Sequence, residues 1–159
     1  MKITIAAVGR LKRGPERELT ERLIKRATMA GRKTGLSFEV REIAESRAGA
    51  ARVRRDQEAA ALLAMVPDKA VLVALDENGA TMDSRAFAAK IGQWRDNGSA
   101  ELVFAIGGAD GHGDALLEHS DLKLAFGAMT WPHQLVRLML AEQLYRSITI
   151  LLGHPYHRG

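Results

Sequence analysis

The residues best suited to chemistry stand near the end of the chain, in the stretch "LLGHPYHRG". Two of the residues there, Tyr156 and His157, can exchange protons, and a third, Arg158, is a permanent cation. Histidine titrates near neutral pH, and arginine binds anions such as phosphate. A frayed polar terminus is the alternative interpretation. We predict no metal site, because His154 and His157 have no cysteine and no nearby carboxylate to complete one.

A second pair of chemically useful residues lies four positions apart, His133 and Arg137. Pro132 fixes a first helical turn, so the two side chains share one face at a helix start. A helix start favours an anion such as a phosphate or a carboxylate. A polar patch without a ligand is the alternative, and a lone His–Arg pair is that more often than a site.

A third feature is the glycine-rich stretch "IGGADGHG", which follows an apolar run. Glycines allow a ligand to approach backbone amides closely, because no Cβ intervenes. The spacing is not the dinucleotide fingerprint, and no P-loop lysine follows, so a nucleotide-dependent oxidoreductase is disfavoured. A turn without a ligand is again the alternative.

The elements that must position these residues alternate between apolar runs and helical patterns. We predict strands at 2–8, 36–43, 70–76, 101–106 and 122–127, and helices at 15–31 (or to 35), 50–65, 84–95 with Ser84 as its cap, 113–119 and 132–152. A turn is predicted at 77–79, "ENG". This alternation favours one three-layer α/β domain over residues 1–159 with a mainly parallel sheet.

In open parallel sheets, ligands lie at the carboxyl ends of the strands. The loops after Leu75, Ile106 and Phe126 are therefore the expected binding loops. The last predicted helix is apolar around most of its circumference, so it must be buried on most sides. We expect a second subunit to cover it, and Glu142 and Arg146 to form a pair there.

Composition narrows the class of protein further. A hydrophobic fraction of 47% with 26% charged residues is globular, and no apolar run is long enough for a signal sequence or a membrane span. The absence of cysteine excludes disulfides, and the cytoplasm is the expected compartment. Residues 1–60 carry 15 Lys/Arg against 8 Asp/Glu, and the rest carry 8 against 11. A basic half indicates a polyanionic partner, or else an ordinary solvated surface.

The motifs "MTWPHQLVR", "EQLYR" and "HPYHR" follow in order within residues 125–158. Together they resemble the C-terminal signature of the RlmH family of SPOUT methyltransferases. The opening "MKITIAAVGRLK" and the "IGG" of the glycine-rich stretch fit the same family over essentially the whole chain. The glycine in "LAFG", where relatives often have serine, is a small departure that a cofactor loop tolerates.

The resemblance implies a homodimer with a C-terminal deep trefoil knot. It also implies methylation of N3 of a pseudouridine in helix 69 of 23S ribosomal RNA, with S-adenosylmethionine as cofactor and the assembled ribosome as the expected substrate. Carried over, the cofactor-binding residues are Leu75, Gly107, Gly108, Phe126, Gly127, Ala128, Met129, Thr130 and Trp131. Base rates alone would not predict a knot.

N3 of pseudouridine is a weakly acidic imide, so a base or a cation near it would speed methylation. The candidate catalytic residues are His157, His133 and Arg137. We expect the tail, with Tyr156 and His157, to close over the partner subunit's cofactor pocket and hold the flipped base, with Arg158 as a further substrate-binding residue. Arg52, Arg54 and Arg55 are expected to bind RNA phosphates. The alternatives are a SPOUT methyltransferase for another RNA, such as tRNA, and a non-catalytic RNA-binding module.

Overall fold

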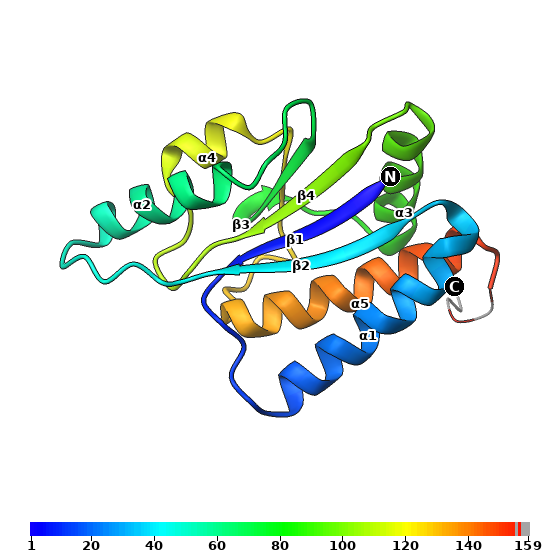
Figure 1. Cartoon of the computed structure of the whole chain (residues 1–159), viewed down its shortest axis with the longest axis horizontal. Helices are drawn as coiled ribbons and strands as arrows, with labels where there is room; N and C mark the ends of the chain where they lie inside the picture. Colours follow the sequence, from blue (N-terminus) through cyan, green and yellow to red (C-terminus); the bar gives the residue numbers. More distant parts are fainter. Residues whose placement is uncertain (155, 157–159) are drawn as a thin grey trace.

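A five-stranded sheet forms the centre of the molecule, in the order β2-β1-β4-β3-β5, with every neighbouring pair parallel. The structure is a computed structural model that describes residues 1–154 and 156 (Figure 1). The strands are β1 (Lys2–Val8), β2 (Ser37–Ile43), β3 (Val71–Ala80), β4 (Glu101–Ile106) and β5 (Leu122–Leu124). The parallel α/β architecture predicted from the alternating pattern is therefore confirmed.

Helices connect the strands and cover both faces of the sheet. They are α1 (Pro15–Gly31), α2 (Ala51–Leu63), α3 (Ser84–Asp96), α4 (Asp114–His119) and α5 (His133–Leu151), with a short 3₁₀ turn η1 (Arg32–Thr34). In Figure 1, α2 and α4 lie on one side of the sheet and α1 and α5 on the other. No helix within residues 1–154 and 156 is long and apolar enough to cross a membrane.

Two separate cores follow from the alternation of side chains along each strand. Ile3 and Ile5 of β1 face the larger core, which contains apolar residues of α1, α3 and α5. Ala6 and Val8 of the same strand face the smaller core beneath α2 and α4. Because both faces are covered, the central strands read as continuous apolar runs in the sequence.

The helix α5 is buried mainly within its own chain. It packs against α1 and α3 on the larger-core face, which covers Leu140, Leu144 and Ile148. Much of its apolar circumference is therefore covered within the chain, and the covering by a second subunit stays a prediction. The predicted Glu142–Arg146 pair is confirmed, with Arg146 Nε donating to Glu142 Oε1 at 2.9 Å.

Three local predictions were wrong. The "ENG" segment is not a turn, because β3 continues to Ala80, which pairs with Leu124 after a register shift. The residue that caps α3 is Asp83 and not Ser84, since the Asp83 carboxylate accepts from the Ala86 N–H at 2.7 Å. The last strand ends at Leu124 and does not reach residue 127.

The extension of β3 brings two stretches of backbone into direct contact. A Cβ built on Gly79 would lie 2.6 Å from the backbone nitrogen of Leu124 and 2.6 Å from the carbonyl carbon of Lys123. The Ala125 N–H also donates to the Ala80 carbonyl at 3.0 Å. Only a residue without a side chain fits at this crossing, so Gly79 fixes how the segment after β5 starts.

Candidate functional site

The loops that follow β3, β4 and β5 meet around one cavity of about 870 Å³. This is the meeting of loops predicted from the carboxyl ends of the strands. The predicted cofactor residues that line the cavity are Leu75, Gly107, Gly108, Phe126, Gly127, Met129, Thr130 and Trp131. Ala128, the remaining one, is exposed and lies outside the lining. The cofactor-binding role of all nine stays a prediction.

The glycine loop, Gly107–Gly113, is shaped by contacts that exclude side chains. A Cβ on Gly108 would lie 2.8 Å from a carboxylate oxygen of Glu58, and one on Gly113 would lie 2.8 Å from the Arg55 carbonyl. The Gly111 N–H closes the turn onto the Gly108 carbonyl at 3.1 Å, and Gly111 has φ of 79°. Because these positions are glycines, α2 can pack closely against one side of the loop while the other side lines the cavity.

His112 belongs to the cavity and was missed by the sequence analysis. Its ring is buried, and its Nε2 lies 3.1 Å from the Leu75 carbonyl oxygen. Burial lowers the pKa of His112 below its usual value, while the Asp76 carboxylate and the carbonyls of Leu75 and Ala105 oppose this less strongly. The buried Nδ1 has no hydrogen-bond partner among the described residues. Nothing in the sequence gives a reason to select His112, because a single histidine in a loop has no partner at a characteristic spacing.

The segment 125–132 forms the rim of the cavity. Its Thr130 hydroxyl donates to the Glu77 carboxylate at 2.7 Å, which joins the rim to the loop after β3. Gly127 has φ of 111°, a conformation that favours glycine. Met129 is 72% exposed and Trp131 is 40% exposed, although both line the cavity. The rim therefore presents apolar side chains above the opening.

Of the two residues predicted at the start of α5, only His133 lines the cavity. Arg137 is 1% exposed; its guanidinium binds the Glu42 carboxylate and donates to the carbonyls of Val8 at 3.3 Å and Gly9 at 2.9 Å. Burial lowers the pKa of Arg137, and Glu42 opposes this. The catalytic role of Arg137 stays a prediction, but the contacts of its guanidinium join α5 to β1 and β2.

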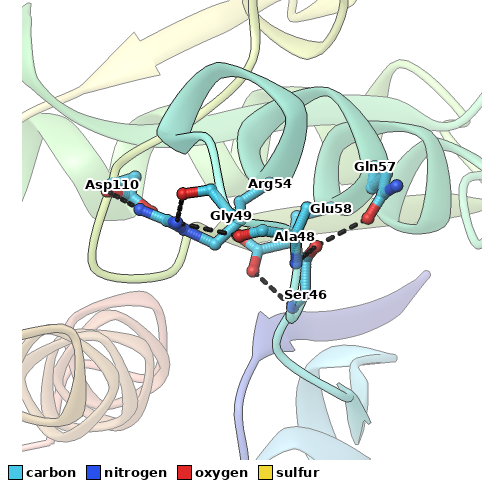
Figure 2. Close-up of polar contacts among 7 residues, drawn as sticks. All are labelled: Ser46, Ala48, Gly49, Arg54, Gln57, Glu58 and Asp110. Carbon is cyan, nitrogen blue, oxygen red and sulfur yellow. Dashed lines mark hydrogen bonds and ion pairs between the residues drawn. The ribbon is translucent and has the colours of Figure 1, made fainter.

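The three arginines predicted to bind RNA are in different environments. Arg52 is exposed and lies 3.8 Å from Asp56. Arg55 lines the cavity and makes no hydrogen bond or ion pair with the described residues. Arg54 is committed to the protein: it donates to both carboxylate oxygens of Asp110, at 2.6 and 3.0 Å (Figure 2).

The tail is described only in part, since His157 and Arg158 lie outside the described residues. The Tyr156 ring packs edge-on against Tyr145, with centroids 4.8 Å apart, and Arg26 and Arg146 lie over it. Burial raises the pKa of Tyr156. Tyr145 lies about 18 Å along the helix from His133, so Tyr156 packs away from the cavity mouth of its own chain.

The charges around the cavity favour a positively charged ligand. Asp76, Glu77 and Asp114 line it, together with Asp110, whose charge is paired with Arg54, whereas Arg55 is the one lysine or arginine among the described lining residues. S-adenosylmethionine carries a sulfonium cation, which suits this lining. The glycine loop allows a ligand to approach its backbone groups closely. The unpaired Nδ1 of His112 is a hydrogen-bond acceptor. The residues present therefore fit that cofactor.

Comparison with known proteins gives a consistent result. The family model described as "Predicted SPOUT methyltransferase" matches residues 1–157. Ribosomal RNA large subunit methyltransferase H of Rhodopseudomonas palustris (strain BisB18) is 56% identical over 160 residues, and its Bradyrhizobium diazoefficiens counterpart is 55% identical. Each alignment covers 100% of both chains.

A solved structure of a probable methylase family protein from Haemophilus influenzae Rd KW20 is more distantly similar. The match has a TM-score of 0.48 and 9% identity, and it covers 99% of this chain and 70% of that one. The full-length matches to the family model and the curated relatives establish that this chain belongs to the RlmH family of SPOUT methyltransferases.

Proposed function

We propose that this chain transfers a methyl group from S-adenosylmethionine to N3 of a pseudouridine in helix 69 of 23S ribosomal RNA. The RlmH family acts on large-subunit ribosomal RNA, and SPOUT methyltransferases use S-adenosylmethionine. The observation that supports this location for the reaction is that three loops distant in sequence converge on one cavity, which is lined by more acidic than basic side chains.

The chain's own residues would hold the cofactor mainly through backbone groups. Gly107 and Gly108 allow close approach, Leu75 and the 125–131 rim supply backbone and apolar contacts, and the acidic lining attracts the cation. When bound, S-adenosylmethionine supplies an electrophilic methyl group. Trp131, partly exposed on the rim, is placed to cover an aromatic ring.

Methyl transfer forms an N3–carbon bond, breaks a sulfur–carbon bond and releases the N3 proton. His133 lines the cavity at the start of α5, so it is the described candidate to accept that proton. Arg55 is placed to stabilise the N3 anion or to hold a neighbouring phosphate, because its guanidinium lines the cavity and forms no hydrogen bond or ion pair with the described residues. His157 and Arg158 remain candidates from the tail.

We further propose a homodimer in which the tail completes the partner's cavity. A second cavity of about 690 Å³ lies along α5, lined by Leu19, Leu23, Phe87, Leu138 and Met139 among others, and it is mostly apolar. The distance from Tyr156 to the cavity of its own chain supports a role in trans. The deep trefoil knot that the resemblance implies belongs to the same proposal.

The RNA would approach along the carboxyl edge of the sheet. Arg10, Lys12 and Arg13, in the loop after β1, are exposed and form no ion pair with the described residues. They adjoin Gly9, whose carbonyl is held by Arg137. These three residues, with Arg52 and Arg55, are our candidates for contacts with RNA phosphates. Arg10, Lys12 and Arg13 were not singled out in the sequence analysis.

The test is incubation of the purified protein and labelled S-adenosylmethionine with 70S ribosomes, free 23S RNA and tRNA, followed by mapping of the modified nucleoside. We expect N3-methylpseudouridine in helix 69 and none in tRNA. Methylated tRNA would favour the alternative substrate. Cofactor binding without transfer to any RNA would overturn the proposed substrate, and absence of cofactor binding would favour a non-catalytic RNA-binding module.

The role of the tail in trans has its own test. A variant with a damaged cavity (Gly107→Trp) and a variant with a damaged tail (His157→Ala) are each expected to be inactive. Mixed dimers should regain activity, because one cavity and one tail are intact and meet across the interface. Mixtures that remain as inactive as the separate variants, although mixed dimers are shown by mass spectrometry, would place the tail in cis.

A further inference from the structure

Arg54 stands out among the basic residues of α2 because every part of its guanidinium is engaged by the protein. Its Nε and Nη2 donate to the two carboxylate oxygens of Asp110, at 2.6 and 3.0 Å. Its Nη1 donates to the carbonyls of Ala48 at 2.9 Å and Gly49 at 3.0 Å. Such paired contacts need the planar fork of arginine, which lysine lacks.

These contacts join two loops that are far apart in the sequence. Asp110 is at the tip of the glycine loop, and the carbonyls of Ala48 and Gly49 belong to the segment that leads from β2 to α2. Figure 2 shows the guanidinium of Arg54 between Asp110 on one side and Gly49 and Ala48 on the other. The hydrogen bonds from Arg54 also hold the pKa of Asp110 below its usual value, so Asp110 stays charged near neutral pH.

A neighbouring residue of α2 reinforces the same arrangement. Glu58 is 6% exposed, and its carboxylate accepts from the Ser46 N–H at 2.9 Å. Its second oxygen would lie only 2.8 Å from a Cβ at Gly108, which leaves no room for a side chain there. The Ser46 hydroxyl donates to Gln57 at 2.6 Å, one helix position before Glu58. Consecutive turns of α2 therefore fix both the loop after β2 and the back of the glycine loop.

We propose that Arg54 is a positioning residue for the cofactor, which holds the glycine loop in its binding shape, and not a ligand of RNA phosphate. The proposal rests on the proposed function in one respect, namely that the cavity binds S-adenosylmethionine. It replaces the RNA-binding role predicted for Arg54 and leaves Arg52 and Arg55 as the RNA-facing arginines of α2. Arg54 acts through Asp110 and the loop backbone, without touching substrate.

The discriminating variant is Arg54→Lys, because lysine keeps the charge that a phosphate needs but cannot make the two-pronged contact with Asp110. We expect Arg54→Lys and Arg54→Gln each to raise the KM for S-adenosylmethionine about three- to five-fold, the range of a partly exposed pair. Asp110→Asn should do the same. The KM for ribosomes and the kcat at saturating cofactor should change less than two-fold in Arg54→Lys.

A double-mutant cycle completes the test. Because Arg54 and Asp110 act through one contact, Arg54→Gln combined with Asp110→Asn should raise the cofactor KM little more than either change alone. The matched control is Arg95→Gln with Asp96→Asn, an arginine–aspartate pair at the end of α3, which should leave both KM values unchanged. Unfolding curves for each variant show whether it is folded.

An RNA-binding role would give the opposite pattern. A raised ribosome KM in Arg54→Gln that Arg54→Lys restores, with the cofactor KM unchanged, would overturn the proposal. Independent, additive effects of the Arg54 and Asp110 changes would overturn it as well. Failure of the wild-type protein to bind S-adenosylmethionine would instead count against the proposed function, so the two failures are distinguishable.

Discussion

The helices on the two faces of the sheet meet it in different ways. On one face, α1, α3 and α5 bury a large apolar core. This face also holds the Arg137–Glu42 ion pair, which is the one ion pair among the described residues whose cation is almost fully buried. On the other face, the core under α2 and α4 is smaller, and α2 adds polar contacts to the glycine loop. The first face buries the larger apolar core, and the second contacts the glycine loop that lines the cavity.

The comparison has a consequence for mutations. A change on the α1–α3–α5 face should appear first in the free energy of unfolding, because it removes buried contacts. A change where α2 meets the glycine loop should appear first in cofactor affinity, because the loop can shift while the core remains. The following variants separate the two readouts, from the largest expected effect to the smallest.

The largest effect is expected for Arg137→Met. The change removes the guanidinium that donates to the Glu42 carboxylate and to the carbonyls of Val8 and Gly9. Glu42 keeps the hydrogen bond from the Leu11 N–H but loses its buried cation, so we expect a loss of about 3 kcal/mol in the free energy of unfolding by urea titration. The control Arg146→Met removes a partly exposed pair on the same helix and should cost about 1 kcal/mol or less. A stable Arg137→Met protein with lost kcat would place Arg137 in the chemistry and break the comparison.

On the other face, Gly108→Ala should act mainly on the cavity. The added methyl group would lie 2.8 Å from Glu58 and 3.1 Å from Val8 Cγ1, and overpacking of this kind costs about 1–3 kcal/mol. We expect the glycine loop to shift and the Kd for S-adenosylmethionine to rise about tenfold by calorimetry. Gly49→Ala, where a Cβ meets open space, is the matched control. Equal affinity in both variants would show that the loop shape is not set by α2.

The smallest effect is the pH dependence due to His112. Because burial lowers its pKa in the folded state, the unfolded chain binds more protons as pH falls below about 6.5, the ordinary value for histidine. The stability is therefore highest well above pH 6.5 and declines as the pH falls through that value. The difference between wild type and His112→Gln should follow this decline in urea titrations at several pH values. A constant difference from pH 7 to 5.5 would contradict the buried, neutral histidine.

Local sequence patterns predicted the elements because each strand and helix has its own periodicity. The run at 101–106 is apolar throughout because β4 is central and covered on both faces, and Pro132 marks the start of α5. The alternation also predicted which loops meet. The end of β3 was misjudged, because "ENG" is common in turns and its pairing with Leu124 depends on a distant segment.

The partners of the arginines could not be predicted in the same way. Arg54 and Asp110 are 56 positions apart, and Arg137 and Glu42 are 95 apart, so no spacing rule connects them. In the sequence, Arg52, Arg54 and Arg55 are one basic run, whereas in the fold one is exposed, one is bound to protein and one faces the cavity. The residue types indicated anion binding. Only the tertiary contacts distinguish the arginines that are bound to the protein from those that could bind an external anion.

The contact between Gly79 and the backbone of Lys123 and Leu124 has a consequence for the order of folding. The two segments touch with no side chain of Gly79 between them, so this contact forms only when both are in place. The chain between them includes α3, β4 and α4, all of which must be accommodated first. Contacts of such long sequence separation form slowly. The rim of the cavity begins directly after this crossing, so we expect a newly made chain to gain its sheet before it can bind its cofactor.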